Sequence, residues 1–370
     1  MSFYDIYTQV KEWPFERFTQ AVSNKDVERV LGKDRLTNED YLTLLSPAAE
    51  PYIEIMAQQA HERTVQHFGR IIQLYQPLYL SDYCVNTCKY CSFSIDNEFP
   101  RRKLTMLEVE QEARAIKAKG IKQIILLTGE SRIHSSVQYL KDCVDVLKHH
   151  FASIAIEIQP LDVPDYQELV NAGIDGLTVY QEVYDEEIYK DIHVKGPKRN
   201  YRYRLDAPER GCQAGMRAVN IGALLGLSDW QKESFITGLH AAYLQNKYLG
   251  TEISVSFPRM RPHAGEYQPS VIVTDRNLVQ AMLALRLYLP RAGITISTRE
   301  EPRLRDHLIP LGVTKMSAAS STVVGGYYNP SAEEPAQSQF EISDERSVAD
   351  IKALLREKGY QPVIKDWQMV

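Results

Sequence analysis

The 370-residue chain contains no window of about 18 apolar residues, the length that a membrane-spanning helix requires. Its first residues, MSFYDIYTQVKEWPFERF, lack an apolar segment behind a basic end, so they do not resemble a signal peptide. Basic runs are also absent, and the net charge of −5 at pH 7 is not typical of a nucleic-acid-binding protein. We therefore expect a cytoplasmic protein that binds neither membranes nor nucleic acid.

Cysteine is scarce as well: the chain has 5, and three of them are Cys84, Cys88 and Cys91. Few, clustered cysteines make a poor disulfide framework but a good metal site in a reducing compartment. A structural zinc ion takes four protein ligands, whereas the spacing C-x3-C-x2-C supplies three thiolates. In an iron–sulfur cluster, three thiolates leave one iron open for an exchangeable ligand. The pattern favours a [4Fe–4S] cluster, with zinc or a redox dithiol as the alternatives.

Apolar, β-rich runs alternate with helical patterns through the middle of the chain. Eight such runs are present, at Ile71–Leu80, Gln123–Leu127, Ile154–Ile158, Leu177–Tyr180, Ala218–Ala223, Ile253–Phe257, Ile294–Ser297 and Val313–Ser317. One helical pattern begins with a Thr105–Glu108 capping box and stops at Gly120. Alternation over roughly 250 residues predicts a (β/α)8 barrel of the α/β class, and a doubly wound open sheet is the second choice.

Segments on either side of the barrel pattern differ from it in composition. Residues 1–70 contain helical patterns only, with Thr37 predicted to open one helix and Gly69 to end a long one. Residues 326–370 are first rich in turn formers and then contain a last helical pattern. We therefore expect an N-terminal helical extension (1–70), a barrel (71–325) and a C-terminal extension (326–370).

The predicted strands end in unusually polar residues. The second, third and fourth runs end in or are followed by TGES, EIQPLD and VYQE, respectively. The sixth, seventh and eighth runs end in or are followed by SFPRMRP, STREEP and MSAASS. A single polar strand end is usually a solvated turn. In a barrel, however, these ends meet at one rim together with the cysteine segment, and barrel enzymes carry their active sites there.

Several runs together are similar to those of one enzyme family: PLYLSDYCVNTCKYCSFS, LLTGES, IEIQPL, VYQEVY, IGALLGLSD, SVSFPRMRP and STRE. They resemble the radical S-adenosylmethionine (SAM) tyrosine lyases, the 2-iminoacetate synthases of thiamine thiazole biosynthesis. The resemblance covers nearly the whole chain. The cysteine triplet alone is specific only to the radical SAM superfamily, whereas the strand-end motifs are specific to its aromatic amino acid lyases.

This resemblance implies a radical SAM barrel of the TIM type that uses a [4Fe–4S] cluster and SAM. The implied reaction cleaves the Cα–Cβ bond of L-tyrosine to 2-iminoacetate (dehydroglycine) and p-cresol, while SAM becomes 5′-deoxyadenosine and methionine. The implied partners are thiazole synthase, which would receive the imine, and a flavodoxin or ferredoxin as electron donor.

The resemblance also implies which residues hold the cluster and SAM. Cys84, Cys88 and Cys91 would ligate iron. The positions implied for SAM are Phe93, Thr128, Gly129, Glu130, Gln159, Glu182, Arg204, Gly222 and Gly226. Within that set, Glu130 would accept hydrogen bonds from the SAM ammonium group, and Arg204 would bind the SAM carboxylate.

For the substrate, a tyrosine zwitterion needs a cation for its carboxylate. Arg299 is the best candidate because a guanidinium can bind a carboxylate through two parallel hydrogen bonds. Tyr79 and Ser317 match positions that contact the substrate in the related lyases. Gln159, Tyr180, Gln181 and Glu182 would line the space between SAM and substrate, or have structural hydrogen bonds there. Arg259 is either a second anion contact or part of a salt bridge at the rim.

Three rival functions remain open. The related maturase of the [FeFe]-hydrogenase carries a second, cysteine-bound cluster in a C-terminal extension, but this chain has no cysteine after Cys212. A lyase for tryptophan or another aromatic amino acid is the second choice, and a zinc-binding scaffold without catalysis is the third. We expect Cys143 in a helix and Cys212 in a loop, as ordinary thiols rather than metal ligands.

Overall fold

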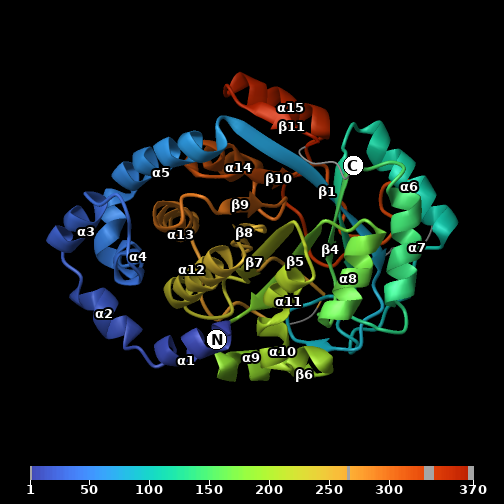
Figure 1. Cartoon of the computed structure of the whole chain (residues 1–370), viewed down its shortest axis with the longest axis horizontal. Coiled ribbons are helices and arrows are strands. Elements are labelled where there is room, and N and C mark those ends of the chain that lie inside the picture. Colours follow the sequence, from blue (N-terminus) through green and yellow to red (C-terminus); the bar gives the residue numbers. More distant parts are fainter. Residues whose placement is uncertain (1, 265–266, 329–336, 366–370) are drawn as a thin grey trace.

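The computed structural model describes residues 2–264, 267–328 and 337–365. Its centre is a barrel of parallel strands surrounded by helices (Figure 1). The barrel strands are β1 (Ile71–Ser81), β3 (Gln123–Thr128), β4 (Ser153–Glu157), β5 (Gly176–Glu182), β7 (Ala218–Ala223), β8 (Glu252–Ser256), β9 (Gly293–Ile296) and β10 (Lys315–Ser317). β10 pairs with β1 from Gln73↔Lys315 to Tyr75↔Ser317, which closes the sheet. The predicted (β/α)8 barrel is confirmed, and the open doubly wound sheet is wrong.

The helices that surround the barrel follow its strands in the order that the sequence predicts. They are α6 (Met106–Ala118), α7 (Val137–Leu147), α8 (Val163–Ala172), α9 (Glu186–Ile192), α10 (Tyr201–Leu205), α11 (Ala207–Gln213), α12 (Trp230–Lys247), α13 (Asp275–Tyr288) and α14 (Pro302–Leu308), with 3-10 turns η2 (Pro197–Arg199) and η3 (Ile309–Leu311). The Thr105–Glu108 capping box opens α6 as predicted, because each side chain accepts a backbone N–H bond from the other residue.

Cys143 is buried in α7, as predicted, whereas the prediction that Cys212 lies in a loop is wrong. Cys212 is a buried residue of α11, a helix of seven residues. The segment is too short to show an apolar period, and Pro208 hides its helical character. Proline is tolerated in a first helical turn, where the N–H that it lacks has no partner within the helix.

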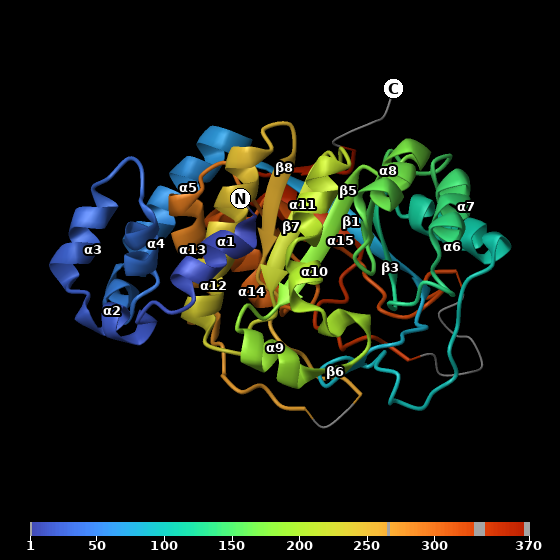
Figure 2. The same ribbon diagram turned by 60° about the horizontal axis from the view of Figure 1, so that its bottom comes forward.

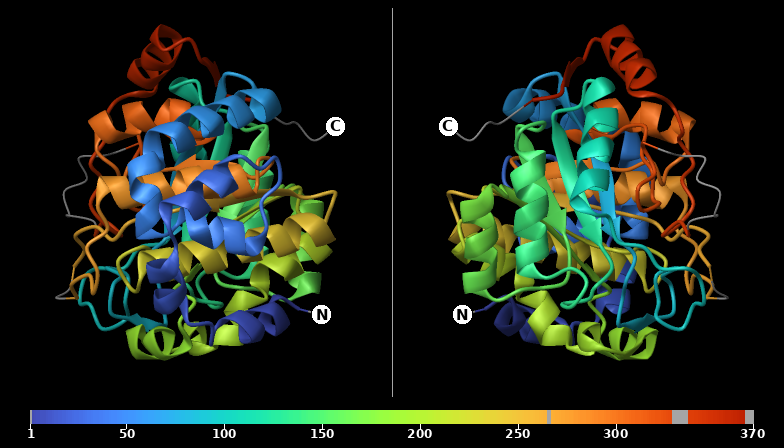
Figure 3. Two further views of the ribbon diagram at one scale, coloured as in Figure 1. Left: turned by 90° about the vertical axis from the view of Figure 1, so that its left-hand side faces the viewer. Right: turned by 90° about the vertical axis from the view of Figure 1, so that its right-hand side faces the viewer.

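Further helices precede β1 and cover one side of the barrel. They are α1 (Phe3–Val10), α2 (Phe15–Ala21), α3 (Asn24–Leu31), α4 (Asn38–Leu44), the 3-10 turn η1 (Pro47–Tyr52) and α5 (Ile53–Phe68). Thr37 caps α4 by accepting a hydrogen bond from the Asp40 N–H, and Gly69 ends α5 with φ of 69°. Figure 1 and the left view of Figure 3 show these helices in blue along the α12 and α13 side.

The last described elements are α15 (Val348–Glu357) and β11 (Gln361–Val363), and β11 pairs in parallel with the beginning of β1. In Figures 1 and 3, α15 lies at the top of the molecule and α9 at the bottom. The division at residues 70 and 325 stays a prediction. Within the described ranges, no helix has both the length and the apolar character that crossing a bilayer requires.

The segment that contains the cysteines leaves the barrel after β1. Its short strand β2 (Thr87–Cys88) pairs in an antiparallel manner with β6 (His193–Lys195), which follows α9. Figure 2 shows α9 and β6 beside this segment, drawn in cyan, at one end of the barrel. This is the end where parallel strands finish, so the cysteines lie at the rim that the sequence indicates.

Candidate active site

The cysteine loop, defined here as residues 82–103, is fixed by side chains that bond its backbone. The Arg101 guanidinium donates hydrogen bonds to the carbonyl oxygens of Asp82 (2.7 Å), Phe93 (2.8 Å) and Ser94 (2.6 Å). Asn86 is fully buried, and its Oδ1 accepts a hydrogen bond from the Lys198 backbone N–H at 2.9 Å. These contacts hold the loop in one conformation, although it contains little regular secondary structure.

The three thiols of the loop are free and influence one another electrostatically. Burial raises the pKa of Cys84, Cys88 and Cys91, to about 11 for Cys91. The ammonium of Lys198 opposes this effect at all three sulfurs, because a nearby cation favours thiolate. Without a metal, the buried thiols therefore favour the protonated form.

Two carboxylates and two cations form a buried network beside the loop. Arg204 donates from Nη1 to Glu130 Oε1 (2.7 Å), from Nη2 to Glu182 Oε1 (3.4 Å) and from Nε to the Tyr180 carbonyl (2.7 Å). The Lys198 ammonium lies 2.8 Å from Glu182 Oε1 and 4.0 Å from Glu130 Oε1. Burial alone would raise the pKa of Glu182, but Lys198 and Arg204 outweigh it and lower that pKa.

Glu182 reaches this network through an unusual backbone conformation. Its φ is 71°, in the left-handed region that residues with a Cβ rarely adopt. The pairing of β5 with β7 shifts register between Tyr180 and Glu182, as in a β-bulge. Bulges of this kind often redirect a side chain next to an active site. The bulge therefore explains how both Tyr180 and Glu182 face the barrel opening.

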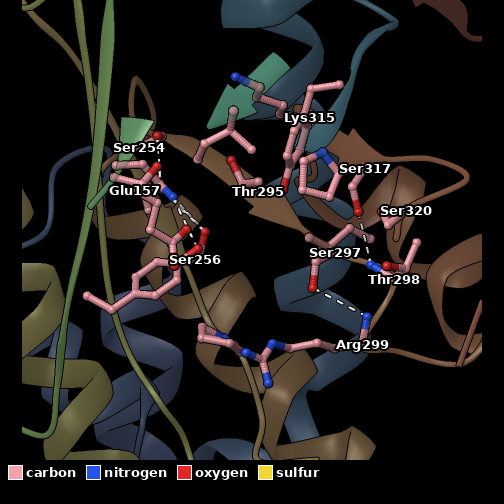
Figure 4. Close-up of a pocket in the computed structure, with 18 of the residues that line it drawn as sticks. Glu157, Ser254, Ser256, Thr295, Ser297, Thr298, Arg299, Lys315, Ser317 and Ser320 are labelled. Atoms are coloured by element: carbon pink, nitrogen blue, oxygen red, sulfur yellow. Dashed lines mark hydrogen bonds between the residues drawn. The ribbon is translucent and has the colours of Figure 1, made fainter. Parts of the chain in front are cut away.

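A cavity, called here the barrel cavity, runs through the inside of the barrel as far as its rim. Its wall includes Tyr75, Tyr79, Leu127, Glu157, Tyr180, Phe257, Arg299, Ser317 and Phe340. Figure 4 shows how Glu157 and Arg299 approach it from opposite sides of that view. Three of the predicted substrate residues, Tyr79, Arg299 and Ser317, thus line one cavity, which is mostly apolar and has a few charged groups.

A second cavity, called here the loop cavity, lies between the barrel cavity and the cysteine loop. Its wall is formed by Tyr90, Cys91, Glu157, Tyr180, Glu182, Lys198, Leu224, Met260, Arg261, Arg299, Gln339 and Phe340. Five residues line both cavities and so mark their junction: Glu157, Tyr180, Arg299, Gln339 and Phe340. A molecule bound beside the cysteines would therefore meet a molecule in the barrel at this junction.

Known proteins match this arrangement. The Radical SAM superfamily model matches residues 78–237, and the Biotin and Thiamin Synthesis associated domain model matches residues 256–361. A 2-iminoacetate synthase of Escherichia coli (strain K12) is 41% identical over 343 residues, which is 92% of this chain and 90% of that protein. This chain belongs to the 2-iminoacetate synthase family. It is accordingly a radical SAM lyase whose cofactors are a [4Fe–4S] cluster and SAM.

Solved structures of the [FeFe]-hydrogenase maturase HydG share this fold. One has a TM-score of 0.89 and 30% identity, covering 95% of this chain and 80% of that chain. HydG from Carboxydothermus hydrogenoformans has a TM-score of 0.84 and 34% identity, covering 97% of this chain and 82% of that chain. Both maturases are thus longer than the region they share with this lyase.

The residues present fit the family's two cofactors. Within the described ranges, no three His, Cys, Asp or Glu side chains converge to hold a single metal ion. In a cubane cluster, by contrast, each thiolate binds its own iron, and metal binding favours the thiolate form. For SAM, Glu130 offers a carboxylate, and Lys198 and Arg204 offer cations. The Thr128 hydroxyl is buried at the end of β3 without a hydrogen-bond partner in the described part of the chain.

The predicted glycines have a structural role that is separate from any ligand. A Cβ on Gly129 would lie 2.7 Å from the Tyr83 carbonyl carbon, and a Cβ on Gly222 would overlap the Ser256 carbonyl oxygen. Gly226 has φ of 113°, and its carbonyl accepts a hydrogen bond from the Ser270 N–H at 2.9 Å. None of the three lines the barrel cavity or the loop cavity. Their predicted contact with SAM stays a prediction.

Other predicted residues already have partners within the protein. Gln159 accepts from the Ser131 N–H (3.2 Å) and donates to the Ser135 carbonyl (2.9 Å). Phe93 packs edge-on against Tyr79, with ring centroids 6.1 Å apart. The buried Gln181 side chain lines neither cavity. Arg259, for which two roles were open, forms a salt bridge with Glu300 and another with Asp275.

Sequence reasoning missed three residues of the site: Asn86, Glu157 and Lys198. A signal for Glu157 existed, because it is the one charged residue inside the apolar run IAIEI. Lys198 belongs to the segment HVKGPKRN, which follows α9 rather than a barrel strand, so strand-end reasoning could not find it. The sequence signal for Asn86 is limited to its position between Cys84 and Cys88.

Proposed function

We propose that this lyase cleaves the Cα–Cβ bond of L-tyrosine, giving 2-iminoacetate and p-cresol, and converts SAM to 5′-deoxyadenosine and methionine. The product would supply the thiazole moiety of thiamine. The observation that carries this proposal is the position of Arg299 at the junction of the two cavities. There it can hold an amino acid carboxylate while the amine faces the loop cavity.

Arg299 is available for such a ligand. It forms no salt bridge within the described residues, and its guanidinium lies 3.4 Å from the centroid of the Phe340 ring. Its backbone N–H donates to Ser297 Oγ at 3.3 Å, which anchors the loop after β9 (Figure 4). An aromatic ring behind a guanidinium leaves the edge with its N–H groups free for a carboxylate.

Each side of the junction would have a distinct task. When bound, the reduced cluster and SAM supply the 5′-deoxyadenosyl radical that removes a hydrogen atom from the substrate. Glu130 would bind the ammonium of SAM, and Lys198 with Arg204 would bind its carboxylate. Arg299, Tyr79 and Ser317 would place tyrosine, because an error of about 1 Å at the reacting atoms can reduce the rate on the order of a hundredfold. The buried cavity would also exclude water from the imine.

The chain's cysteine content separates this function from that of the maturases. We propose one cluster per chain, because outside the triplet only Cys143 and Cys212 remain, and both are buried in helices. Thiazole synthase is the proposed acceptor of the imine, and a flavodoxin or ferredoxin is the proposed electron donor. The domain boundaries at residues 70 and 325 belong to the same proposal.

Anaerobic turnover tests the proposal directly. Reconstituted protein is incubated with SAM, dithionite and L-tyrosine, and p-cresol, glyoxylate from imine hydrolysis and 5′-deoxyadenosine are quantified. We expect p-cresol and glyoxylate in equal amounts, and about four iron atoms per chain. A parallel incubation with L-tryptophan should give no corresponding lyase product. Cleavage of tryptophan in place of tyrosine would contradict the proposed substrate.

A further inference from the structure

Within the part of the chain that the structure describes, Glu157 differs from the other carboxylates of the site in having no partner. It ends β4 and lines both the barrel cavity and the loop cavity. Glu130 and Glu182 are each bonded to Arg204, whereas the Glu157 carboxylate accepts no hydrogen bond and forms no salt bridge within the described part of the chain. A carboxylate in a mostly apolar cavity is costly unless a ligand or a proton compensates its charge.

The electrostatic surroundings of Glu157 agree with that conclusion. Burial raises its pKa to about 7, and repulsion from Glu182 adds to the effect, while Arg299, Arg204 and Lys198 oppose it. The carboxylate therefore changes charge in the neutral pH range. A group with such a pKa at the mouth of a cavity is suited to accept a proton.

Glu157 and Arg299 together present opposite charges at the same junction. Figure 4 shows them on different sides of the cavity, Glu157 from β4 and Arg299 from the loop after β9. An α-amino acid carries a carboxylate and an ammonium on neighbouring atoms, so it can meet both side chains at once. This complementarity identifies the head group of an amino acid, rather than its ring, as the ligand of the junction.

We propose that Glu157 binds the ammonium of the amino acid substrate and takes one proton from it before the hydrogen atom is removed. One N–H bond of the ammonium breaks heterolytically, and its proton forms an O–H bond with the Glu157 carboxylate. The nitrogen keeps the electron pair, so no oxidant or reductant is needed. This assignment rests on the proposed tyrosine lyase function.

Proton transfer costs less here than in water for a physical reason. Burial disfavours charged forms, so it lowers the pKa of an ammonium and raises that of a carboxyl, which brings the two values closer together. Removing a hydrogen atom from the resulting neutral amine leaves a neutral nitrogen radical. Removing it from an ammonium would leave a buried radical cation, which is costly in an apolar cavity. Glu157 thus prepares the amine as a general base.

The phenol of the substrate is the competing partner for Glu157. The carboxylate is close enough to the hydroxyls of Tyr75, Tyr79 and Tyr180 to raise the pKa of each through repulsion. Two substrate analogues separate the possibilities. The compound 3-(4-hydroxyphenyl)propanoate keeps the phenol but lacks the amine, and L-phenylalanine keeps the amine but lacks the phenol hydroxyl.

Binding is measured by equilibrium dialysis with the oxidised holoenzyme and SAM, where no turnover occurs. In Glu157→Gln we expect the affinity for L-tyrosine and L-phenylalanine to fall on the order of tenfold, the equivalent of a charged hydrogen bond. The affinity for 3-(4-hydroxyphenyl)propanoate should stay unchanged. Equal losses for tyrosine and the propanoate, with no loss for phenylalanine, would assign Glu157 to the phenol and overturn the proposal. Unchanged tyrosine affinity would also overturn it.

The pH dependence gives a readout that a merely structural role would not change. In the wild-type protein, p-cresol formation should decrease as the pH falls through about 7, because protonated Glu157 cannot accept a proton. In Glu157→Gln that acid limb should be absent and 5′-deoxyadenosine should exceed p-cresol. The matched control is Glu233→Gln, a buried carboxyl on α12 whose pKa burial also raises, to about 8, but which lines neither cavity. Glu233→Gln should keep the wild-type profile.

Two outcomes separate this inference from the function on which it rests. A wild-type protein that forms no p-cresol contradicts the tyrosine lyase function itself. A wild-type protein that forms p-cresol at the same rate from pH 6 to pH 8, within the range that Glu157 titrates, contradicts the role of Glu157 alone. The wild-type profile also decides the question if Glu157→Gln fails to fold.

Discussion

Arg204 donates a hydrogen bond to one oxygen of Glu130 at 2.7 Å, and Asn86 donates to the other at 2.9 Å. Glu130 thus connects α10 with the cysteine loop, and it is also the proposed acceptor for the SAM ammonium. Arg204, the residue predicted to bind the SAM carboxylate, is therefore already bonded to Glu130, the residue predicted to bind the SAM ammonium. Lys198, which lies 4.0 Å from Glu130, is a second cation beside that site.

Replacing Glu130 by alanine should weaken SAM binding and loosen the cysteine loop. A lost hydrogen bond to a charged group costs about 1.5–3 kcal/mol, which is roughly 10- to 150-fold in affinity. Equilibrium dialysis of SAM with reconstituted protein gives the affinity. The matched control is Glu168→Ala, which removes an exposed carboxylate on α8 that pairs with Lys141. This variant should keep the wild-type affinity for SAM. SAM affinity equal to that of the wild type would remove Glu130 from the SAM site.

Alanine at Cys84, Cys88 or Cys91 should abolish SAM cleavage and lower the iron content. The reason is that each thiolate binds a different iron, and no other thiol lies in the loop. Cys143→Ala and Cys212→Ala remove buried thiols of α7 and α11 and should retain about four iron atoms per chain. Iron content and absorbance near 400 nm distinguish the two groups. Full iron and turnover in Cys88→Ala would contradict the cluster assignment.

Adding one methyl group at Gly129 should displace the cysteine loop. The new Cβ would lie 2.7 Å from the Tyr83 carbonyl carbon, and backbone cannot move aside as a flexible side chain can. We expect Gly129→Ala to cost about 1–3 kcal/mol and to lower the iron content after reconstitution. Gly250→Ala is the matched control, because no atom outside its immediate neighbours lies within 4 Å of the added Cβ. Normal cluster content in Gly129→Ala would show that the loop can shift without loss.

Arg299→Lys should uncouple SAM cleavage from product formation. Lysine keeps the charge but loses the planar arrangement of donors, so the amine of tyrosine is no longer fixed at the cavity junction. We expect a normal cluster, weaker tyrosine binding and 5′-deoxyadenosine in excess of p-cresol. Arg259→Lys, which changes a guanidinium paired with Glu300 and Asp275, should keep the wild-type ratio. An unaltered ratio in Arg299→Lys would place the carboxylate elsewhere.

His240 should make the folded protein sensitive to acid. It is buried, its ring stacks on Phe3 with centroids 4.0 Å apart, and burial lowers its pKa from 6.5 to about 3. Below pH 6.5 the unfolded state binds a proton that the folded state excludes, so the free energy of unfolding should fall by up to about 1.4 kcal/mol per pH unit. Melting temperatures of His240→Phe should decline less between pH 7 and pH 5 than those of the wild type. Parallel declines would show that His240 is protonated in the fold.

Strand positions were predictable because the barrel strands are buried on both sides and form apolar runs. The run Ala218–Ala223 coincides with β7, and the other predicted runs differ from the observed strands by a few residues at most. Thr37 and Thr105 were equally clear, since an N-cap acts through neighbours in sequence. Cys212 was misplaced because a helix of seven residues shows no apolar period.

Residues of the site were predictable only where they come directly after a barrel strand in the sequence. Arg299 and Glu130 stand at strand ends, and the sequence brings both to the rim. Lys198 reaches the site because β6 pairs with β2, a contact between residues about a hundred positions apart. Asn86 is significant only through its bonds to Glu130 and Lys198, which depend on the tertiary fold. No local pattern encodes such contacts.

The pairing of β2 with β6 also has a consequence for synthesis on the ribosome. Cys91 is translated long before Lys198 and Ala264, which bond Asn86 and Ser92 of the cysteine loop. At about 5–20 residues per second, the interval between Cys91 and Ala264 lasts roughly 10–35 s. During that interval the nascent thiols lack the contacts that later enclose them, so they are open to oxygen and to adventitious metals. We therefore expect a stable iron–sulfur cluster to form only after the barrel has closed around the loop.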